Sequence, residues 1–154
     1  MNKIDAQIIR MDKNIPAPRY ATDGSAGLDI FSPYPTDFPI QPGLTVKIET
    51  KLKIYTGNPN FVLLAVPRSG LGSQGMQLKN TIGVIDADYQ GEIILNVLNN
   101  DDWSLLTIPG YLSGKPFAQI LCVPVHQLEL NEVENFTETS ERGEGGFGST
   151  DSGK

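Results

Sequence analysis

The sequence has little cysteine, little histidine and no long apolar run. Cys122 is its only cysteine, which excludes an intrachain disulfide and suits a reducing compartment. We therefore expect a cytoplasmic location, or the host cytoplasm if the source is viral. No apolar run approaches the roughly 20 residues that a membrane-spanning helix requires, and the first residues lack the apolar core of a signal peptide. The sequence predicts no membrane partner.

Positive charge is also scarce, because 12 Lys and Arg residues stand against 18 Asp and Glu residues, for a formal net charge of −6. A protein that binds the phosphate backbone of nucleic acid usually carries a basic patch, and here the basic residues are few and scattered. We therefore predict no nucleic-acid partner. A polyanionic ligand of this chain should be small, and a cation should help to hold it. His126 is the only histidine, so a centre that needs two histidines is excluded.

The sequence does contain a series of short apolar or alternating runs, separated by proline and glycine. Strands are expected at residues 4–8, 46–49, 52–54, 61–66, 92–98 and 118–125. No window gives a long amphipathic helix, and one short helical turn is expected to begin near Ser69. A chain of 154 residues suits one domain. The pattern predicts an all-β sandwich or barrel.

The stretch PRSGLGSQGM, residues 67–76, contains glycines at the Gly-x-Gly-x-x-Gly spacing of a dinucleotide-binding loop. That fold needs a long helix after the glycines and then another parallel strand. The residues that follow Gly75 are too few for this helix and crossover, and no acidic residue stands at the expected offset of about 20 residues. A Walker-type loop is excluded as well, because Gly-Lys-Ser/Thr is absent. We nevertheless expect the loop to meet phosphate.

Three further stretches place chemically useful side chains among small or apolar residues. They are SAGLDIFSP with Asp29, NTIGVIDADYQGEI with Asp86 and Asp88, and GKPFAQIL with Gln119. Asp and Gly favour turns, so the two aspartates can mark a hairpin turn. A carboxylate buried beside the neighbouring tyrosine ring would instead be placed to act as a general base for water. The sequence alone does not rank Asp86 over Asp88.

From about residue 131 the chain becomes polar, acidic and then glycine-rich. By composition this segment should be a mobile, solubilising tail. Yet the stretch RGEGGFGST sets Arg142, Phe147, Ser149 and Thr150 among glycines. An arginine can bind phosphate through two hydrogen bonds, and an aromatic ring can stack on a base. Composition leaves both interpretations open.

Five stretches, in order along the chain, resemble the motifs of the trimeric dUTPase family. They read AGLDI, PRSGL, GVIDADYQGEI, AQI and RGEGGFGST, and they spread from Ala26 to Thr150. The resemblance implies a jelly-roll-like distorted β-barrel with one short helix, a homotrimer and a flexible C-terminal arm. We expect residues 1–133 to form the barrel domain and residues 134–154 to form the arm. Motifs from different subunits would share each of three active sites.

The resemblance also implies a Mg²⁺-dependent enzyme that hydrolyses dUTP to dUMP and pyrophosphate. This activity would limit uracil incorporation into DNA and supply dUMP for dTMP synthesis. Asp86 would activate the water that attacks the α-phosphorus, and Tyr89 would pack under the deoxyribose and exclude a 2′-hydroxyl. The uracil edge would be read by Asn80 and by the backbone of Gly83, Val84 and Ile85.

The phosphates would meet Arg68, Ser69 and Gly70, with Gln119 nearby. Asp29 would act near the metal through water, while Mg²⁺ itself should sit mainly on the phosphates. In the arm, the resemblance implies substrate contacts for Arg142, Phe147, Gly148, Ser149 and Thr150. The arginine would meet the γ-phosphate, and the phenylalanine would stack over uracil.

Two positions depart from the family pattern. Phe31, after AGLDI, stands where a polar or basic residue is common, and the other departure is at Pro116. The family usually has arginine three residues before the motif-four glutamine, and this chain has Pro116 there, with Lys115 before it. Lys115 can replace the missing charge only in part, because an ammonium is a point charge rather than a fork. Two alternatives stay open, a dCTP deaminase-like enzyme and a dUTP-gated regulatory module that binds another protein.

Overall fold

Short strands make up almost all the regular structure of the chain. The computed structural model describes residues 3–145. In chain order the strands are β1 (Gln7–Arg10), β2 (Arg19–Tyr20), β3 (Gly27–Ile30), β4 (Phe38–Ile40), β5 (Thr45–Glu49), β6 (Leu52–Tyr55), β7 (Phe61–Pro67), β8 (Met76–Leu78), β9 (Gly83–Ile85), β10 (Ile94–Asn99), β11 (Leu106–Ile108) and β12 (Ala118–Pro124). The helix α1 (Ser69–Gly72) follows β7, and the 3-10 turn η1 (Tyr111–Ser113) follows β11. Helix α1 begins where the sequence predicts a helical turn.

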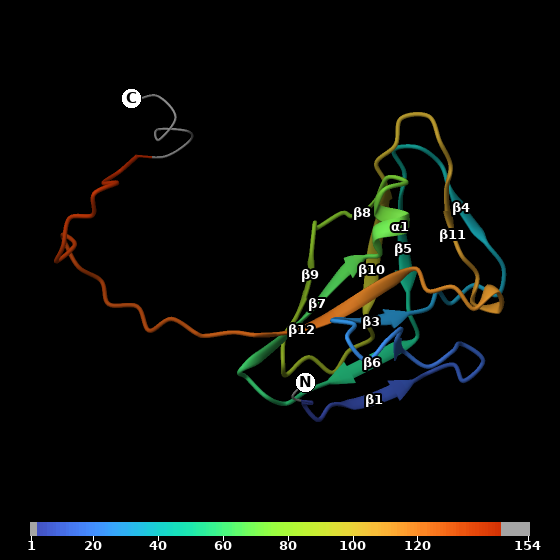
Figure 1. Ribbon diagram of the computed structural model, residues 1–154, viewed down its shortest axis with the longest axis horizontal. Coiled ribbons are helices and arrows are strands. Elements are labelled where there is room, and N and C mark those ends of the chain that lie inside the picture. The colour runs from blue at the N-terminus through green and yellow to red at the C-terminus, as the bar shows by residue number, and fades with distance from the viewer. Residues whose placement is uncertain (1–2, 146–154) are drawn as a thin grey trace.

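The strands form four sheets around one core (Figure 1). The largest sheet has the order β2-β3-β12-β7-β9, and a second has the order β5-β10-β8. The pairs β1-β6 and β4-β11 complete the arrangement, and the paired strands are antiparallel. The predicted all-β, jelly-roll-like fold with one short helix is confirmed. Within residues 3–145 the sheets do not close into a barrel, because the edge strands β2 and β9 of the largest sheet have only two and three residues.

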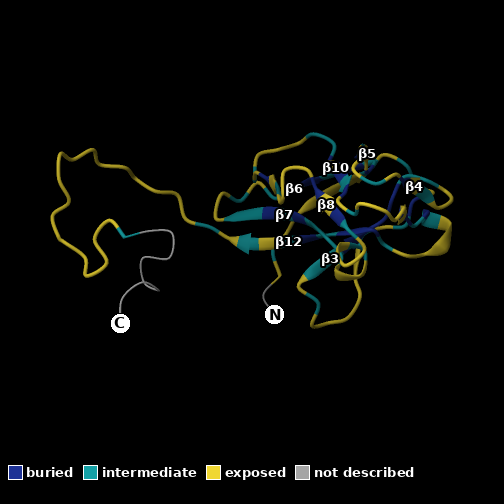
Figure 2. Ribbon diagram, turned by 90° about the horizontal axis from the view of Figure 1, so that it is seen from above, coloured by how far each residue is buried: buried dark blue, intermediate teal, exposed yellow. Residues whose placement is uncertain are grey.

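Buried and more exposed residues alternate along the strands, which explains why this sequence folds around one core. In β6 and β10 every second residue is buried, which places one face of each strand inside. Ile48, Val97, Leu106 and Phe117 have no exposed surface, and Figure 2 shows the buried residues gathered inside the body. Each such side chain stabilises the fold by about 1.5–3 kcal/mol when it leaves water.

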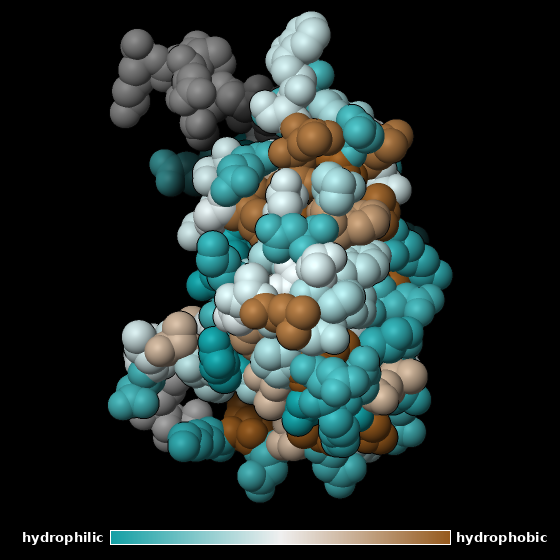
Figure 3. All heavy atoms as spheres, turned by 90° about the vertical axis from the view of Figure 1, so that its right-hand side faces the viewer, coloured by the Kyte–Doolittle hydropathy of each residue, from teal (hydrophilic) through white to brown (hydrophobic). Residues whose placement is uncertain are grey.

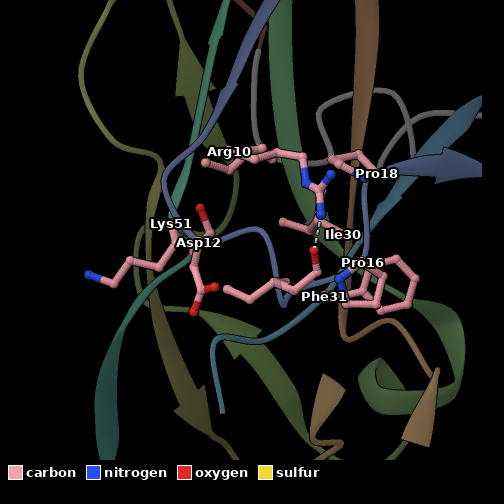
Figure 4. A pocket seen from close by; sticks show the side chains of 10 residues that line it. Arg10, Asp12, Pro16, Pro18, Ile30, Phe31 and Lys51 are labelled. Carbon is pink, nitrogen blue, oxygen red and sulfur yellow. Dashed lines mark hydrogen bonds between the residues drawn. The ribbon is translucent and has the colours of Figure 1, made fainter. Parts of the chain in front are cut away.

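Arg10, at the end of β1, fixes the segment that leads into β2. One terminal guanidinium nitrogen, Nη2, donates to the carbonyl of Lys13 at 2.9 Å and to the carbonyl of Ile15. Figure 4 shows this guanidinium directed toward the segment that carries Pro16 and Pro18. The cavity here measures only about 10 Å³, far too little for a nucleotide. Arg10 therefore positions the chain and does not bind a ligand.

Beyond β12 the chain leaves the body and runs away from it (Figure 1). The amide of Val125 still donates to the carbonyl of Asn60 at 2.9 Å. After that point residues 126–144 are exposed, and Leu128 and Leu130 keep 83% and 84% of their surface accessible. Among residues 3–145, no helix has the length and apolar character that crossing a membrane would take.

Candidate active site

Three of the sequence motifs meet on one face of the largest sheet. Asp29 of β3 lies opposite Gln119 of β12, and Gln119 lies opposite Val66 of β7. Residues directly opposite in antiparallel strands point to the same face, and so do residues two apart on one strand. Arg68 follows Val66 by two residues, and its Nε lies 2.9 Å from Oδ1 of Asp29. We call Asp29, Arg68 and Gln119 the Asp29 cluster.

The ion pair in the Asp29 cluster leaves Arg68 able to bind a second anion. Asp29 is only 6% exposed, and a carboxylate so buried needs a partner. Arg68 supplies its Nε, which leaves the two terminal nitrogens of a 40% exposed side chain as donors. Gln119 is fixed as well, because its Nε2 donates to the carbonyl of Pro67 at 3.1 Å. The cluster therefore presents a guanidinium fork that suits a phosphate.

The glycines of the loop after β7 serve different purposes. Gly75 has a φ of +92°, and a Cβ there would lie 3.0 Å from the amide nitrogen of Asp101, so the turn itself requires glycine. A Cβ at Gly70 would meet nothing within 4 Å, so the fold does not require glycine at that position. Ser69 and Gly70 are exposed at the start of α1. They follow Arg68 directly and are open to a ligand, and their contact with phosphate stays a prediction.

The third motif forms an edge of the same sheet. Strand β9 (Gly83–Ile85) is the last strand on this side, with Ile85 opposite Leu63 of β7. Asn80 is exposed in the turn before β9, and Val84 is 62% exposed within it. An edge strand presents unpaired N–H and C=O groups. The backbone of β9 therefore offers fixed donors and acceptors where the sequence predicts recognition of a base; we call residues 80–91 the β9 hairpin.

Asp86 comes directly after β9 and is exposed. With Asp88 it lines an open groove of about 600 Å³, which Tyr55 and Phe61 also line. The expectation of a carboxylate buried beside a tyrosine ring is therefore wrong for the single chain, because the chain turns away from the sheet after Ile85. Asp86 is therefore open to solvent at the groove.

Tyr89, in the β9 hairpin, has a hydrogen-bonded hydroxyl and a partly exposed ring. Its hydroxyl donates to the carbonyl of Glu92 at 2.9 Å, and 43% of its surface is exposed. A fixed and exposed aromatic ring can pack against the apolar side of a ligand. The contact between Tyr89 and a sugar stays a prediction.

Sequence reasoning missed two glycines that shape the site. A Cβ at Gly27 would overlap Oε1 of Gln119, and a Cβ at Gly91 would overlap the hydroxyl oxygen of Tyr89. A side chain at either position would displace a site side chain. The signal was present in the sequence, since Gly27 stands two residues before Asp29 and Gly91 stands two residues after Tyr89.

Arg68 and Asp86 lie at opposite ends of β7, while β9 itself runs back alongside β7 with Gly83 opposite Ala65. Ile85 is opposite Leu63, so Asp86 is level with Val62. Arg68 follows Val62 along β7, and the intervening residues, at about 3.3 Å each, separate Arg68 from Asp86 by about 20 Å. A single chain therefore does not bring Asp86 and Arg68 together.

Of the site residues predicted in the C-terminal segment, the structure describes Arg142. Arg142 is exposed, and its Nε donates to the carbonyl of Gly145 at 2.8 Å. The remaining predicted arm residues lie outside the described residues 3–145; they are Phe147, Gly148, Ser149 and Thr150.

The protein alone offers a metal few ligands. Residues 3–145 contain no group of three or more His, Cys, Asp or Glu side chains that could hold a metal ion. Asp29 brings one carboxylate, and one of its oxygens already pairs with Arg68. This donor set suits Mg²⁺ that phosphates and waters hold, and it fits the predicted contact of Asp29 through water.

A guanidinium fork, a fixed glutamine and exposed loop residues at one end of an antiparallel sheet define a protein that handles phosphorylated ligands. A family model described as dUTPase matches residues 13–151. The deoxyuridine 5′-triphosphate nucleotidohydrolase of Haemophilus influenzae is 45% identical over 153 residues, which cover 96% of this chain and 97% of that protein. The corresponding Escherichia coli protein is 44% identical over 151 residues, with coverages of 96% and 97%. The chain belongs to the dUTPase family, and it is an enzyme of the class that hydrolyses dUTP.

Solved structures agree with this family. The Staphylococcus bacteriophage 80alpha dUTPase with dUPNHPP is 28% identical and superposes with a TM-score of 0.77, covering 94% of this chain and 97% of that one. A mutant dUTPase from phage phi11 of S. aureus, described by its coordination of a structural Mg(II) ion, is 24% identical with a TM-score of 0.73. That alignment covers 87% of this chain and 99% of the phage protein, and it supports the fold alone.

Proposed function

We propose that this enzyme hydrolyses dUTP to dUMP and pyrophosphate with Mg²⁺, through attack of an Asp86-activated water on the α-phosphorus. The reaction would limit uracil incorporation into DNA and supply dUMP for dTMP synthesis. One observation supports the proposal. The chain belongs to the dUTPase family, and its motif residues gather in two places, the Asp29 cluster and the β9 hairpin. The Asp29 cluster suits phosphates, and the β9 hairpin suits a nucleoside.

Asp86 suits the role of general base because its carboxylate is exposed beside the groove. It would take a proton from water while the water oxygen forms a bond to the α-phosphorus. The bond from that phosphorus to the bridging oxygen breaks, and pyrophosphate leaves with the oxygen. The ring of Tyr89 would lie under the deoxyribose and leave no room for a 2′-hydroxyl.

The phosphates would be held by Arg68, Ser69 and Gly70, with Gln119 beside them. Asp29 fixes Nε of Arg68, so the terminal nitrogens are directed to the ligand at little entropic cost. Mg²⁺ would be held by the triphosphate and by waters, one of which contacts Asp29. When bound, the ion would neutralise charge on the phosphates.

The uracil edge would be read by Asn80 and by the edge backbone of Gly83, Val84 and Ile85. Fixed backbone donors and acceptors would reject the amino group of cytosine. We propose residues 1–133 as the barrel domain and residues 134–154 as the arm that closes over the ligand. The arm residues that would contact substrate are Arg142, Phe147, Gly148, Ser149 and Thr150.

We propose a homotrimer, because Asp86 and Arg68 of one chain lie about 20 Å apart along β7. A site that needs both residues must take them from different copies. The surface supports assembly, since Leu128, Leu130 and Val133 are 83%, 84% and 55% exposed. Figure 3 also shows apolar side chains interrupting the polar surface at the end formed by the β4–β5 and β10–β11 loops. These exposed apolar side chains would be available to contact another copy of the chain.

Pyrophosphate release from dUTP, dCTP, dTTP and UTP, each with and without Mg²⁺, tests the activity. We expect release from dUTP alone and only with Mg²⁺. Equal turnover of all four nucleotides, or ammonia release from dCTP, would contradict the proposal. Analytical ultracentrifugation of the same protein tests the assembly, because a fully active monomer is incompatible with shared sites.

A second function, a dUTP-gated contact with another protein, is favoured by Trp103. Its side chain is 91% exposed on a loop where Asp101 accepts hydrogen bonds from the amides of Trp103 and Ser104, at 2.8 and 2.7 Å. An ordered loop that presents an indole is typical of protein interfaces. The solved phage dUTPase is described as controlling transfer of virulence genes. A pull-down with wild type and Trp103→Ala, with and without dUTP, tests this function; equal capture in all four conditions would contradict it.

A further inference from the structure

Arg19 is a second guanidinium on the face that carries the Asp29 cluster. Strand β2 pairs with β3, and Arg19 lies directly opposite Asp29, so both side chains point to one face. The guanidinium carbon of Arg19 lies 5.2 Å from the ring centroid of Phe31. Phe31 follows Asp29 by two residues and therefore shares its side of the sheet. Two independent contacts thus place Arg19 beside the cluster.

The guanidinium group of Arg19 lies at the same end of the sheet as Arg68. Ile30 of β3 and Pro67 of β7 are opposite the same residue of β12. Phe31 and Arg68 each follow these partners by one residue, so they stand at the same level of the sheet. Because Arg19 covers Phe31, the guanidinium groups of Arg19 and Arg68 lie on either side of Asp29, at the end where the phosphates are proposed to bind.

The two guanidinium groups differ in how their charge is balanced. Arg68 pairs with Asp29, whereas none of the three ion pairs found among residues 3–145 involves Arg19. Arg19 is instead held by the ring of Phe31 and by a long hydrogen bond, 3.4 Å, from its Nη2 to the carbonyl of Gly114. Its side chain is exposed. A guanidinium that is positioned, exposed and without a carboxylate partner is available to an anionic ligand.

Arg19 contacts the loop that leads into β12, and this loop contains no arginine. Gly114 precedes Lys115 and Pro116, and Pro116 occupies the position where the sequence pattern leads one to expect arginine. A triphosphate carries several negative charges, and the Arg68 charge is already shared with Asp29. The phosphate end of the site therefore needs a further cation, and Arg19 stands where it can supply one.

We propose that Arg19 binds the pyrophosphate half of the substrate, the β- and γ-phosphates, and supplies the guanidinium that is absent at Pro116. This assignment rests on the proposed hydrolysis of dUTP. Phe31 beneath the guanidinium plane keeps the fork oriented while its N–H groups reach phosphate oxygens. Lys115 can add charge near the site, but an ammonium cannot make the two parallel hydrogen bonds of a guanidinium.

The test compares Arg19→Gln with Lys115→Gln, a matched control that removes one positive charge four residues before Gln119. Isothermal titration measures the binding of a non-hydrolysable imido analogue of dUTP and of dUMP, and steady-state assays give kcat and KM. For Arg19→Gln we expect the Kd of the analogue and the KM for dUTP to rise about tenfold, as the loss of a charge-assisted hydrogen bond predicts. Binding of dUMP and kcat should stay unchanged, because the lost contact concerns phosphates that dUMP lacks.

Three results would overturn the assignment. They are unchanged affinity of Arg19→Gln for the analogue, an equal effect of Lys115→Gln, or an equal loss of dUMP affinity. Arg19→Lys keeps the charge over Phe31 but not the fork, so it should fall between wild type and Arg19→Gln, and unfolding temperatures verify that each variant is folded. If wild type hydrolyses dUTP and Arg19→Gln binds normally, only the role of Arg19 fails; if wild type does not hydrolyse dUTP, the proposed function fails with it.

Discussion

At the scale of single residues, the site uses side chains that are fixed at one atom and open at the others. Arg68 is bonded through Nε to Asp29 and keeps its terminal nitrogens for a ligand. Tyr89 is bonded through its hydroxyl to the carbonyl of Glu92 and keeps its ring exposed. Fixing a side chain before the ligand arrives lowers the entropy lost on binding. Neither residue needs the ligand in order to reach its position.

Asp86 is the residue whose exchange should separate chemistry from binding. Asp86→Asn keeps the shape of the side chain but removes the base that accepts a proton from water. We expect kcat for dUTP to fall by at least about 100-fold, the usual contribution of a general base. Binding of the imido analogue, measured by titration, should stay close to wild type. Near-normal turnover would remove Asp86 from this role, and Asp88→Asn, which lines the same groove, is the matched comparison.

Gly91 offers a test of the contact between Tyr89 and the sugar. The Cβ of Gly91→Ala would meet the Tyr89 hydroxyl and displace the ring. We expect the preference for dUTP over UTP, measured as the ratio of kcat/KM values, to fall about tenfold, since a displaced ring no longer excludes the 2′-hydroxyl. Gly24→Ala is the control, because a Cβ at Gly24 meets nothing within 4 Å. Unaltered discrimination in Gly91→Ala would show that Tyr89 does not set the preference.

At the scale of elements, long apolar strands were predictable and short edge strands were not. The predicted strands at 61–66 and 118–125 agree with β7 (Phe61–Pro67) and β12 (Ala118–Pro124). The predicted strand at 4–8 is displaced to β1 (Gln7–Arg10), because its pairing with β6 sets its limits and the sequence does not show that partner. Strand β2 has two residues, too few for any alternation to be seen. Arg19 was missed for this reason.

For the site, the sequence likewise indicated candidate residues but not their arrangement in space. The motifs identified Asp29, Arg68 and Gln119, and their assembly follows from the register of β3, β12 and β7. That register is a tertiary property, so the sequence could not show that Asp86 lies about 20 Å from Arg68 along β7. Nor could it show that Asp86 is exposed, since burial depends on where the chain turns after β9.

In the β10–β11 loop, a turn is held by the side chain of Asp101, whose carboxyl group can titrate. Hydrogen bonds from the amides of Trp103 and Ser104 hold the pKa of Asp101 below its ordinary value of 3.8. A carboxyl whose pKa is lowered on folding stabilises the fold fully above the unfolded pKa, and this contribution is lost as the pH falls through the folded pKa. Asp101→Ala should therefore unfold at a lower temperature than wild type at pH 7, and the difference should shrink below pH 3.8.

Circular dichroism melts at a series of pH values measure this effect. Asp102→Ala is the control, because Asp102 is exposed and accepts none of the described side-chain hydrogen bonds of the loop. A difference between Asp101→Ala and wild type that does not change with pH would show that the carboxylate charge plays no part in the turn.

At the scale of the whole molecule, an acidic protein handles an acidic ligand by concentrating its few cations. The formal net charge is −6, yet one face of the largest sheet carries Arg68 and Arg19 on either side of a single buried carboxylate. A small anion can be held by such a local arrangement, whereas a long polyanion would be repelled by the rest of the surface. The overall charge therefore helps to select the size of the ligand.

In the proposed trimer, strand β7 would separate Arg68 from Asp86 of the same chain, so that the two residues would serve two different active sites. Two defective chains should consequently repair each other when they are unfolded together and refolded as a mixture. Neither Asp86→Asn nor Arg68→Gln should turn over dUTP alone, but about one site in four of a randomly mixed symmetric trimer would combine an intact Asp86 with an intact Arg68. Recovery of roughly that fraction of wild-type turnover is expected. Failure of the mixture to regain activity would show that each chain completes its own site.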